Sequence, residues 1–251
     1  MRTAYTWYLW WEGQYGTYDN ECCVPDGVFS GTDAAYGALI SYYLPRAAPT
    51  AWIDVLDPAG KRIRRFDVSA EAGINRTSWD LLENPVVAWN AARDWNQAWN
   101  APMVVPATYT LVLHADSASV SQKVEVSADP RAHWTQAQYV ARHDFIASLD
   151  EELSQIDTAL NRLDGLLASA SGTRRREIEV VYRQFTSGIV NSEDDQWMPD
   201  RVRERLTILL GVVNLSQGPP LPPHLAEAAE IHTEFLNVMN AYRELIGEAG
   251  K

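Results

Sequence analysis

The first half of the chain alternates hydrophobic and polar residues with a period of two, as β-strands with one buried face do. The turn residues Asp57-Pro58-Ala59-Gly60 occupy their preferred type I positions, so the runs on either side of them are expected to pair as a hairpin. Short strands separated by turns, with no helical pattern between them, predict an antiparallel β-sandwich. The expected strands are residues 38–44, 51–56, 62–68, 75–81, 108–113 and 119–126.

After Asp129-Pro130 the hydrophobic residues recur every three or four positions, which is typical of amphipathic helices. Thr135 and Gln138 match a capping box, the signature of a helix start. The long helix that follows has an apolar stripe made of Ile146, Leu149, Leu153, Ile156, Leu160, Leu163 and Leu167. Three shorter helices are expected after it, separated by Ser171-Gly172, by Pro199 and by the proline-rich connector 218–223.

The apolar stripes of these helices are expected to bury against one another, with the last helix packed antiparallel to the long one. Leu153→Asp should then place an unpaired charge in the shared seam and cost about 3 kcal/mol or more. The same change at Asn161, on the opposite face of the long helix, should cost almost nothing.

The predicted fold class is therefore α+β in two units. Residues 31–130 are expected to form an antiparallel Ig-like or fibronectin-III-like β-sandwich, and residues 131–251 an α-helical bundle or a long helical hairpin. Residues 1–30 form an aromatic N-terminal segment ahead of them. The core of the sandwich should include Trp79, Tyr109 and Leu111.

Charge narrows the possible partners. The 251 residues carry 21 Lys and Arg against 33 Asp and Glu, a net charge of -12 that repels phosphate backbones and anionic lipid surfaces. Nucleic acid is therefore not an expected partner. Membrane insertion is not expected either, because no stretch approaches the ~20 apolar residues that span a bilayer. The first residues also lack the apolar region of a signal peptide.

The only cysteines, Cys22 and Cys23, are adjacent. Two cysteines are neither a disulfide framework nor a zinc ligand set, so no metal site is expected. Ordinary thiols are favoured over a vicinal or intermolecular disulfide, and the compartment of the protein stays open on this evidence.

Several weak motifs occur in an order that resembles one family. They are the run Phe29 to Leu44, Asp57 to Gly60, Asn75 to Leu81, Pro106 to Thr110 and Asp129 to Arg131. Together they look like the C-terminal region of bacterial sortilin-like or sialidase-like β-propeller proteins with BNR repeats. In that family a propeller is followed by an Ig-like sandwich, similar to that of the flagellar-hook-capping protein, and then by a helical tail. The sequence departs from the family pattern at Ala34, Ala35 and Ala107, where prolines and a glycine are usual.

The resemblance implies that a propeller would precede residue 1 and that any glycosidase activity would belong to it. It also implies an extracytoplasmic location. The chain itself contains no Asp-box, GxSxG, HExxH or P-loop motif, so no catalytic residue, cofactor or enzyme activity is expected in it.

Isolated polar residues are assigned to ordinary roles. The carboxylate pairs Asp54 with Asp57 and Glu151 with Glu152 are taken as surface charge, because glycoside hydrolysis needs two carboxylates facing each other across a cleft. His232 is taken as a hydrogen-bonded core or boundary residue. The run Arg174-Arg175-Arg176 is a solvated face or a docking contact.

The insertion 86–102 is longer than most sandwich connections. Indole rings can stack on sugars while amides bind their hydroxyls, so this insertion is a candidate carbohydrate platform. The favoured alternative is a loop folded over the open edge of the sandwich, or the remnant of a contact with another domain. The candidate residues are three Trp-Asn pairs, Trp89-Asn90, Trp95-Asn96 and Trp99-Asn100.

Two functions follow. The first is a non-catalytic interaction module that docks on a β-propeller or another protein, or on a second copy of itself. The aromatic residues Trp7, Trp10 and Trp11 are candidates for this docking. The alternative is a carbohydrate-binding auxiliary region of a sialidase-like glycoside hydrolase, which depends on the Trp-Asn pairs being exposed.

Overall fold

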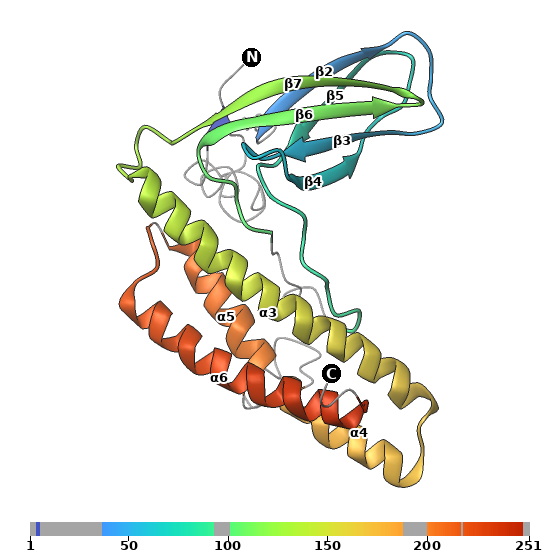
Figure 1. The fold of residues 1–251 in the computed structure, drawn as a ribbon, viewed down its shortest axis with the longest axis vertical. Helices are drawn as coiled ribbons and strands as arrows, with labels where there is room; N and C mark the ends of the chain where they lie inside the picture. Colours follow the sequence, from blue (N-terminus) through green and yellow to red (C-terminus); the bar gives the residue numbers. More distant parts are fainter. Residues whose placement is uncertain (1–3, 6–36, 93–100, 188–199, 217, 248–251) are drawn as a thin grey trace, which may run out of the picture. The chain divides into compact units, whose positions relative to one another are not determined.

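The computed structural model describes residues 4–5, 37–92, 101–187, 200–216 and 218–247 (Figure 1). The chain forms two compact units. The strand unit comprises Met1–Asn84 and Pro102–His143, and the helical unit comprises Pro85–Ala101 and Asp144–Lys251. The insertion thus belongs to the helical unit, although it lies within the sequence of the strand unit. A strand region followed by a helical region confirms the predicted α+β class.

The strand unit contains two sheets. The larger has the order β1-β7-β6-β3-β4, with every neighbouring pair antiparallel except β1 and β7, and the smaller pairs β2 with β5 antiparallel. Most strand positions match the sequence prediction. The strands are β1 (Ala4–Tyr5), β2 (Ala38–Leu44), β3 (Ala51–Leu56), β4 (Arg62–Asp67), β5 (Gly73–Trp79), β6 (Ala107–Ala115) and β7 (Ala118–Ser127).

Hydrogen bonds and backbone conformation at single residues determine where the strands turn or end. The Asp57 carboxylate accepts hydrogen bonds from the backbone N–H groups of Ala59 and Lys61, at 2.9 and 2.8 Å, which confirms the predicted turn between β3 and β4. Asp116 adopts a left-handed φ of 52° and lets β6 and β7 join through a two-residue turn. Leu81 has a φ of 64°, so β5 stops at Trp79, two residues earlier than predicted.

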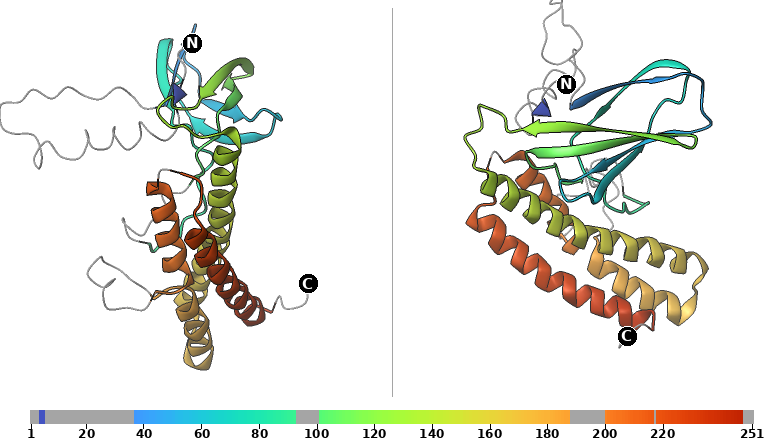
Figure 2. Two further views of the ribbon diagram at one scale, coloured as in Figure 1. Left: turned by 90° about the vertical axis from the view of Figure 1, so that its left-hand side faces the viewer. Right: turned by 45° about the horizontal axis from the view of Figure 1, so that its top comes forward.

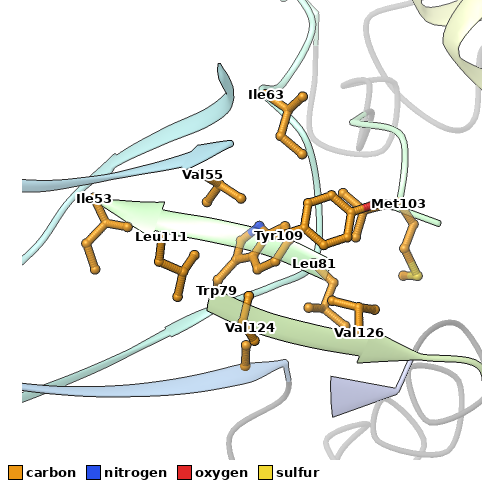
Figure 3. Packing of buried hydrophobic residues seen from close by; sticks show 12 residues of the cluster. Ile53, Val55, Ile63, Trp79, Leu81, Met103, Tyr109, Leu111, Val124 and Val126 are labelled. Atoms are coloured by element: carbon orange, nitrogen blue, oxygen red, sulfur yellow. The ribbon is translucent and has the colours of Figure 1, made fainter. Parts of the chain in front are cut away.

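One hydrophobic core receives side chains from both sheets, so their inner faces pack against each other (Figure 3). Trp79 and Tyr109 meet edge to face with ring centroids 5.4 Å apart, and the indole N–H of Trp79 donates to the carbonyl of Leu82 at 2.9 Å. Leu111 is buried beside them, which confirms the predicted core. Gly37 packs closely here, because a Cβ on it would lie 2.0 Å from the Trp79 carbonyl oxygen.

The helical unit is built from four helices, α3 (Gln136–Ser169), α4 (Gly172–Phe185), α5 (Val202–Leu215) and α6 (Pro222–Leu245), of which α3 begins in the strand unit. The predicted capping box is present, because the Thr135 N–H donates to Gln138 Oε1 at 2.8 Å and the Gln138 N–H to Thr135 Oγ1 at 3.3 Å. The six stripe residues of α3 from Ile146 to Leu163 are buried, as are apolar residues of the other three helices.

The predicted antiparallel packing of α3 and α6 is wrong. Glu152 of α3 lies 2.6 Å from His232 of α6, and Arg174, just after the end of α3, donates to the carbonyl of Leu245 at the end of α6. The two helices therefore run in the same direction, and α4 and α5 run back between their ends (Figure 2). The length of α3 explains this direction. Because α3 has 34 residues, the chain returns along it through two 14-residue helices, α4 and α5, before α6 begins.

Two of the three consecutive arginines have structural partners. Arg174 donates to the Leu245 carbonyl at 2.8 Å and Arg175 to the Leu167 carbonyl at 3.1 Å. Carbonyls in the last turn of a helix have no partner within the helix, and cations near them are favourable. These two side chains are therefore helix caps, a role that the sequence analysis did not assign.

Among the described residues, no helix is long and apolar enough to cross a membrane.

Candidate functional site

The first Trp-Asn pair lies along α3 and does not fold over a sheet edge. Trp89 is only 4% exposed, so its ring has no free face for a sugar. Around it are six residues of the helical unit, which we call the Trp89 site: Ser154, Asp157, Asn161 and Asp164 of α3, Tyr182 of α4 and Arg203 of α5.

Polar side chains of α3 hold the backbone of the insertion. The N–H of Val87 donates to Ser154 Oγ at 3.2 Å, and the N–H of Trp89 donates to Asp157 Oδ2 at 2.9 Å. Asn161 makes two bonds, since its Nδ2 donates to the Ala88 carbonyl at 2.9 Å and its Oδ1 accepts the Asn90 N–H at 2.8 Å. Backbone groups of the insertion are thereby hydrogen-bonded on a helix surface, and the segment ends in a turn, in which the Ala92 N–H donates to the Trp89 carbonyl at 3.0 Å.

The indole is held on three sides. Its N–H donates to Asp164 Oδ2 at 2.7 Å, the Arg203 guanidinium lies 5.1 Å from the ring centroid, and the Tyr182 ring meets it edge to face at 6.3 Å. Burial, and next the Asp164 carboxylate, raise the pKa of the Tyr182 phenol above its ordinary value. Tyr182 therefore stays protonated and can donate a hydrogen bond to Asp164.

Arg203 and Asp157 form a bidentate ion pair beneath the indole. The two contacts measure 2.6 Å from Nε to Oδ1 and 3.1 Å from Nη2 to Oδ2, and both side chains are 0% exposed. Desolvating two charges is costly, and the mutual attraction offsets this cost only with good geometry and additional hydrogen bonds. The Trp89 N–H provides one such bond to Asp157.

Glu204, the neighbour of Arg203, is a second buried charge at the start of α5. It is 2% exposed and accepts hydrogen bonds from the hydroxyl of Thr186 and the N–H groups of Arg201 and Ser187. The carboxylate thus satisfies backbone donors at a helix start, and its contacts connect the end of α4 to the start of α5.

A separate charged cluster lies on the strand unit. Asp54 of β3 accepts two hydrogen bonds from Arg65, at 2.7 and 2.8 Å, and lies 3.2 Å from His114 Nε2. The His114 ring stacks on Trp52 with centroids 5.0 Å apart. The hydrogen bond from Arg65, together with the charges of Arg65, Arg62 and His114, holds the pKa of Asp54 below its ordinary value despite partial burial.

This lowered pKa predicts an acid-sensitive contribution to stability. A carboxyl group with a folded pKa below its unfolded value of about 3.9 stabilises the fold above that pH and loses this effect as the pH falls through the folded value. We expect the strand unit of the Asp54→Asn variant to lose less stability than the wild type between pH 5 and strongly acidic pH. Urea titrations followed by near-UV circular dichroism across that range would measure the difference. Parallel pH profiles would contradict the expectation.

The carboxylates of the two pairs taken as surface charge each contact other residues, and for Asp54 the expectation is wrong, because it is only 7% exposed. Asp57 is engaged in its turn and Asp54 in the contact with Arg65. Glu152 binds His232, whereas Glu151 accepts a bond from Gln155. The side chain of His232 is 53% exposed, so it is a surface residue that binds Glu152 and not the core or boundary residue expected from the sequence.

The smaller sheet carries an exposed apolar surface. Leu39, Tyr43 and Ile74 are 56%, 67% and 78% exposed, and Tyr43 lies directly opposite Ile74 in the β2–β5 ladder. Side chains alternate along each strand, so this surface, the β2–β5 outer face, lies opposite the buried core.

Several predicted site residues lie outside the described residues. They are Trp7, Trp10 and Trp11, the pair Cys22 and Cys23, and the second and third Trp-Asn pairs, Trp95-Asn96 and Trp99-Asn100. Asn90 is described, and it contributes its backbone N–H to the Trp89 site.

Within the described part of the chain, no three His, Cys, Asp or Glu side chains are grouped as metal ligands.

Sequence reasoning missed the polar stripe of α3. Ser154, Asp157, Asn161 and Asp164 follow one another at spacings of three, four and three, and such residues share one side of a helix. The sequence analysis therefore did not assign to Asn161 its contacts with the insertion. Comparison of the chain with protein-family models, with curated proteins and with solved structures finds no match.

Proposed function

We propose that this chain is a non-catalytic module that binds another protein through the β2–β5 outer face. The observation that carries this proposal is the exposure of Leu39, Tyr43 and Ile74 on one side of a two-stranded sheet. Tyr43 and Ile74 are cross-strand neighbours, and Leu39 lies on the same side beyond the Ser41–Arg76 pair. Exposed apolar side chains gathered on one side of a folded domain are typical of surfaces that a partner covers. The sequence resemblance favours a β-propeller as that partner.

We further infer that the strand unit is an Ig-like or fibronectin-III-like sandwich. The order β4-β3-β6-β7 in one sheet, with β2-β5 facing it across the core, supports this inference. Domains of this class are common interaction modules, although a shared fold does not by itself define a function. The four helices with buried stripes are interpreted as its helical tail.

The alternative, a carbohydrate-binding region of a sialidase-like glycoside hydrolase, rests on fewer residues than the sequence offered. Because Trp89 is buried, only Trp95 and Trp99 remain as candidates for stacking on sugar rings. The interaction module is favoured because its surface is present among the described residues.

Site-specific photo-crosslinking in the native host tests the proposal. A photoreactive amino acid at position 74 is expected to give a discrete crosslinked protein, to be identified by mass spectrometry as a propeller or another defined partner. The same amino acid at the exposed Ser121, on the larger sheet, is the matched control and should not capture it. Tyr43→Glu should abolish the product from position 74. The same products from both positions, or none from either, would contradict the proposal.

A further inference from the structure

The Trp89 site recognises features that another peptide could supply. Four of its five hydrogen bonds to the insertion use backbone atoms of Val87, Ala88, Trp89 and Asn90, and the fifth uses the indole N–H. The stacking contacts also involve only the indole. The requirement is therefore a short segment with one tryptophan, in which the backbone groups next to the tryptophan are available to the site; in the bound segment a turn follows at Asn90 and Ala91.

The chain contains the bound tetrapeptide twice. Ala88-Trp89-Asn90-Ala91 occupies the site, and Ala98-Trp99-Asn100-Ala101 repeats it ten residues later. Gln97 precedes the second tetrapeptide, and its backbone N–H is equivalent to the one that Val87 supplies before the first tetrapeptide. The two tetrapeptides differ in the residue that follows them. The N–H of Ala92 donates to the Trp89 carbonyl at 3.0 Å, whereas Pro102, which follows the second tetrapeptide, has no N–H.

The remaining Trp-Asn pair matches less well. Trp95 is preceded by Asp94, where the bound segment has Ala88. A carboxylate at that position would lie next to residues that contact Asp157 and Asp164, and like charges repel. The second tetrapeptide is therefore the better match.

The charges of the site favour recognition over simple stability. A buried ion pair such as Arg203 with Asp157 is often no more stabilising than apolar residues of the same volume. Here it presents a carboxylate oxygen to one backbone N–H and a guanidinium to one aromatic ring. An apolar surface could bury the indole but would not select the backbone position.

We propose that the Trp89 site is a peptide-recognition site for Ala-Trp-Asn-Ala, filled by residues 88–91 of its own chain, and that its ligand in trans is Ala98–Ala101 of a second copy of this protein. The tethered segment has an effective concentration on the order of millimolar, so it excludes the second tetrapeptide at micromolar protein. When residues 88–91 leave the site, it becomes available to Ala98–Ala101 of a second protein molecule. This inference is independent of the β2–β5 outer face, and the two proposals can fail separately.

Peptide binding to the vacated site is the first test. The Trp89→Ala variant is titrated with a capped peptide of residues 97–102, and the control peptide has alanine in place of tryptophan. We expect the natural peptide to raise the Tm of the variant by several degrees at millimolar concentration, with no response from the wild type or to the control peptide. If the variant is unfolded at 25 °C, the peptide is expected to restore helical circular dichroism. No response in either signal, or an equal response to both peptides, overturns the proposal.

Self-association is the second test. By sedimentation velocity, Trp89→Ala is expected to associate at tens of micromolar. The double variant Trp89→Ala/Trp99→Ala is expected to associate at least about tenfold more weakly, because the indole is the principal anchor. Trp89→Ala/Trp95→Ala is the matched control and should associate like the single variant. A monomeric Trp89→Ala protein, or association that persists without Trp99, overturns the proposal.

Discussion

Asp157→Ala is expected to lower the free energy of unfolding of the helical unit by about 3–5 kcal/mol, because it removes the carboxylate that pairs with the buried Arg203 guanidinium. It also removes the acceptor of the Trp89 N–H. Urea denaturation followed by far-UV circular dichroism would measure the loss. Glu151→Ala, an exposed position on the same helix, is the control and should change stability by no more than about 0.5 kcal/mol.

A double variant separates the loss of this ion pair from the other effects of the Asp157 substitution. Asp157→Ala/Arg203→Met removes both charges and is expected to be more stable than Asp157→Ala alone, since replacing a whole buried pair is often nearly neutral. Recovery should be incomplete, because the Trp89 N–H still lacks its acceptor. A loss in Asp157→Ala no larger than that in Glu151→Ala would contradict the burial of this pair.

Leu153→Asp is expected to cost about 3 kcal/mol or more, because Leu153 is 0% exposed among the stripe residues of α3. Asn161→Asp is expected to cost about 1–3 kcal/mol, in contrast to the neutral effect predicted from sequence. The change replaces the Nδ2 donor to the Ala88 carbonyl by a carboxylate oxygen, so that carbonyl loses its hydrogen bond.

Thr158→Asp supplies the neutral control that Asn161 cannot, because Thr158 is exposed on α3. Thermal melts and urea titrations of the three variants should rank Leu153→Asp as the most destabilised, then Asn161→Asp, then Thr158→Asp. Equal losses at Asn161 and Thr158 would show that the insertion does not bind α3 in solution.

Features encoded by neighbouring residues were predictable from the sequence. The strands β2 to β7 follow from period-two patterning, whereas β1 was not predicted. The β3–β4 turn follows from Asp57 and Gly60, and the start of α3 from Thr135 and Gln138. Each of these depends on residues a few positions apart, where backbone conformation and side-chain hydrogen bonds are determined locally.

The direction of α6 was not predictable in the same way. An apolar stripe specifies which side of a helix is buried but not the direction of the helix that covers it. The decisive contacts, Glu152 with His232 and Arg174 with the Leu245 carbonyl, join residues 80 and 71 positions apart. Sequence pattern carries no information on such pairs.

The location of Trp89 was missed for a related reason. A tryptophan in a long insertion between strands satisfies the pattern of an exposed binding loop, and its buried partners lie on three helices more than 60 residues away. The sequence feature that could have located Trp89 lies on α3, whose side chains contact it. Polar residues at helical spacing beside the apolar stripe of α3 are costly to bury and therefore imply hydrogen-bonding partners.

Amide hydrogen exchange at Trp89 and Asn90 tests the central claim most directly, namely that the insertion is bound to the helical unit through the Trp89 site. Both N–H groups donate to α3 side chains, so they should exchange as slowly as amides in the buried middle of α3. The Trp89→Ala variant should lose this protection at Asn90 while the amides of β3 and β6 keep theirs. Exchange of the Trp89 and Asn90 amides at the rate of an unstructured peptide in the wild-type protein would contradict the account.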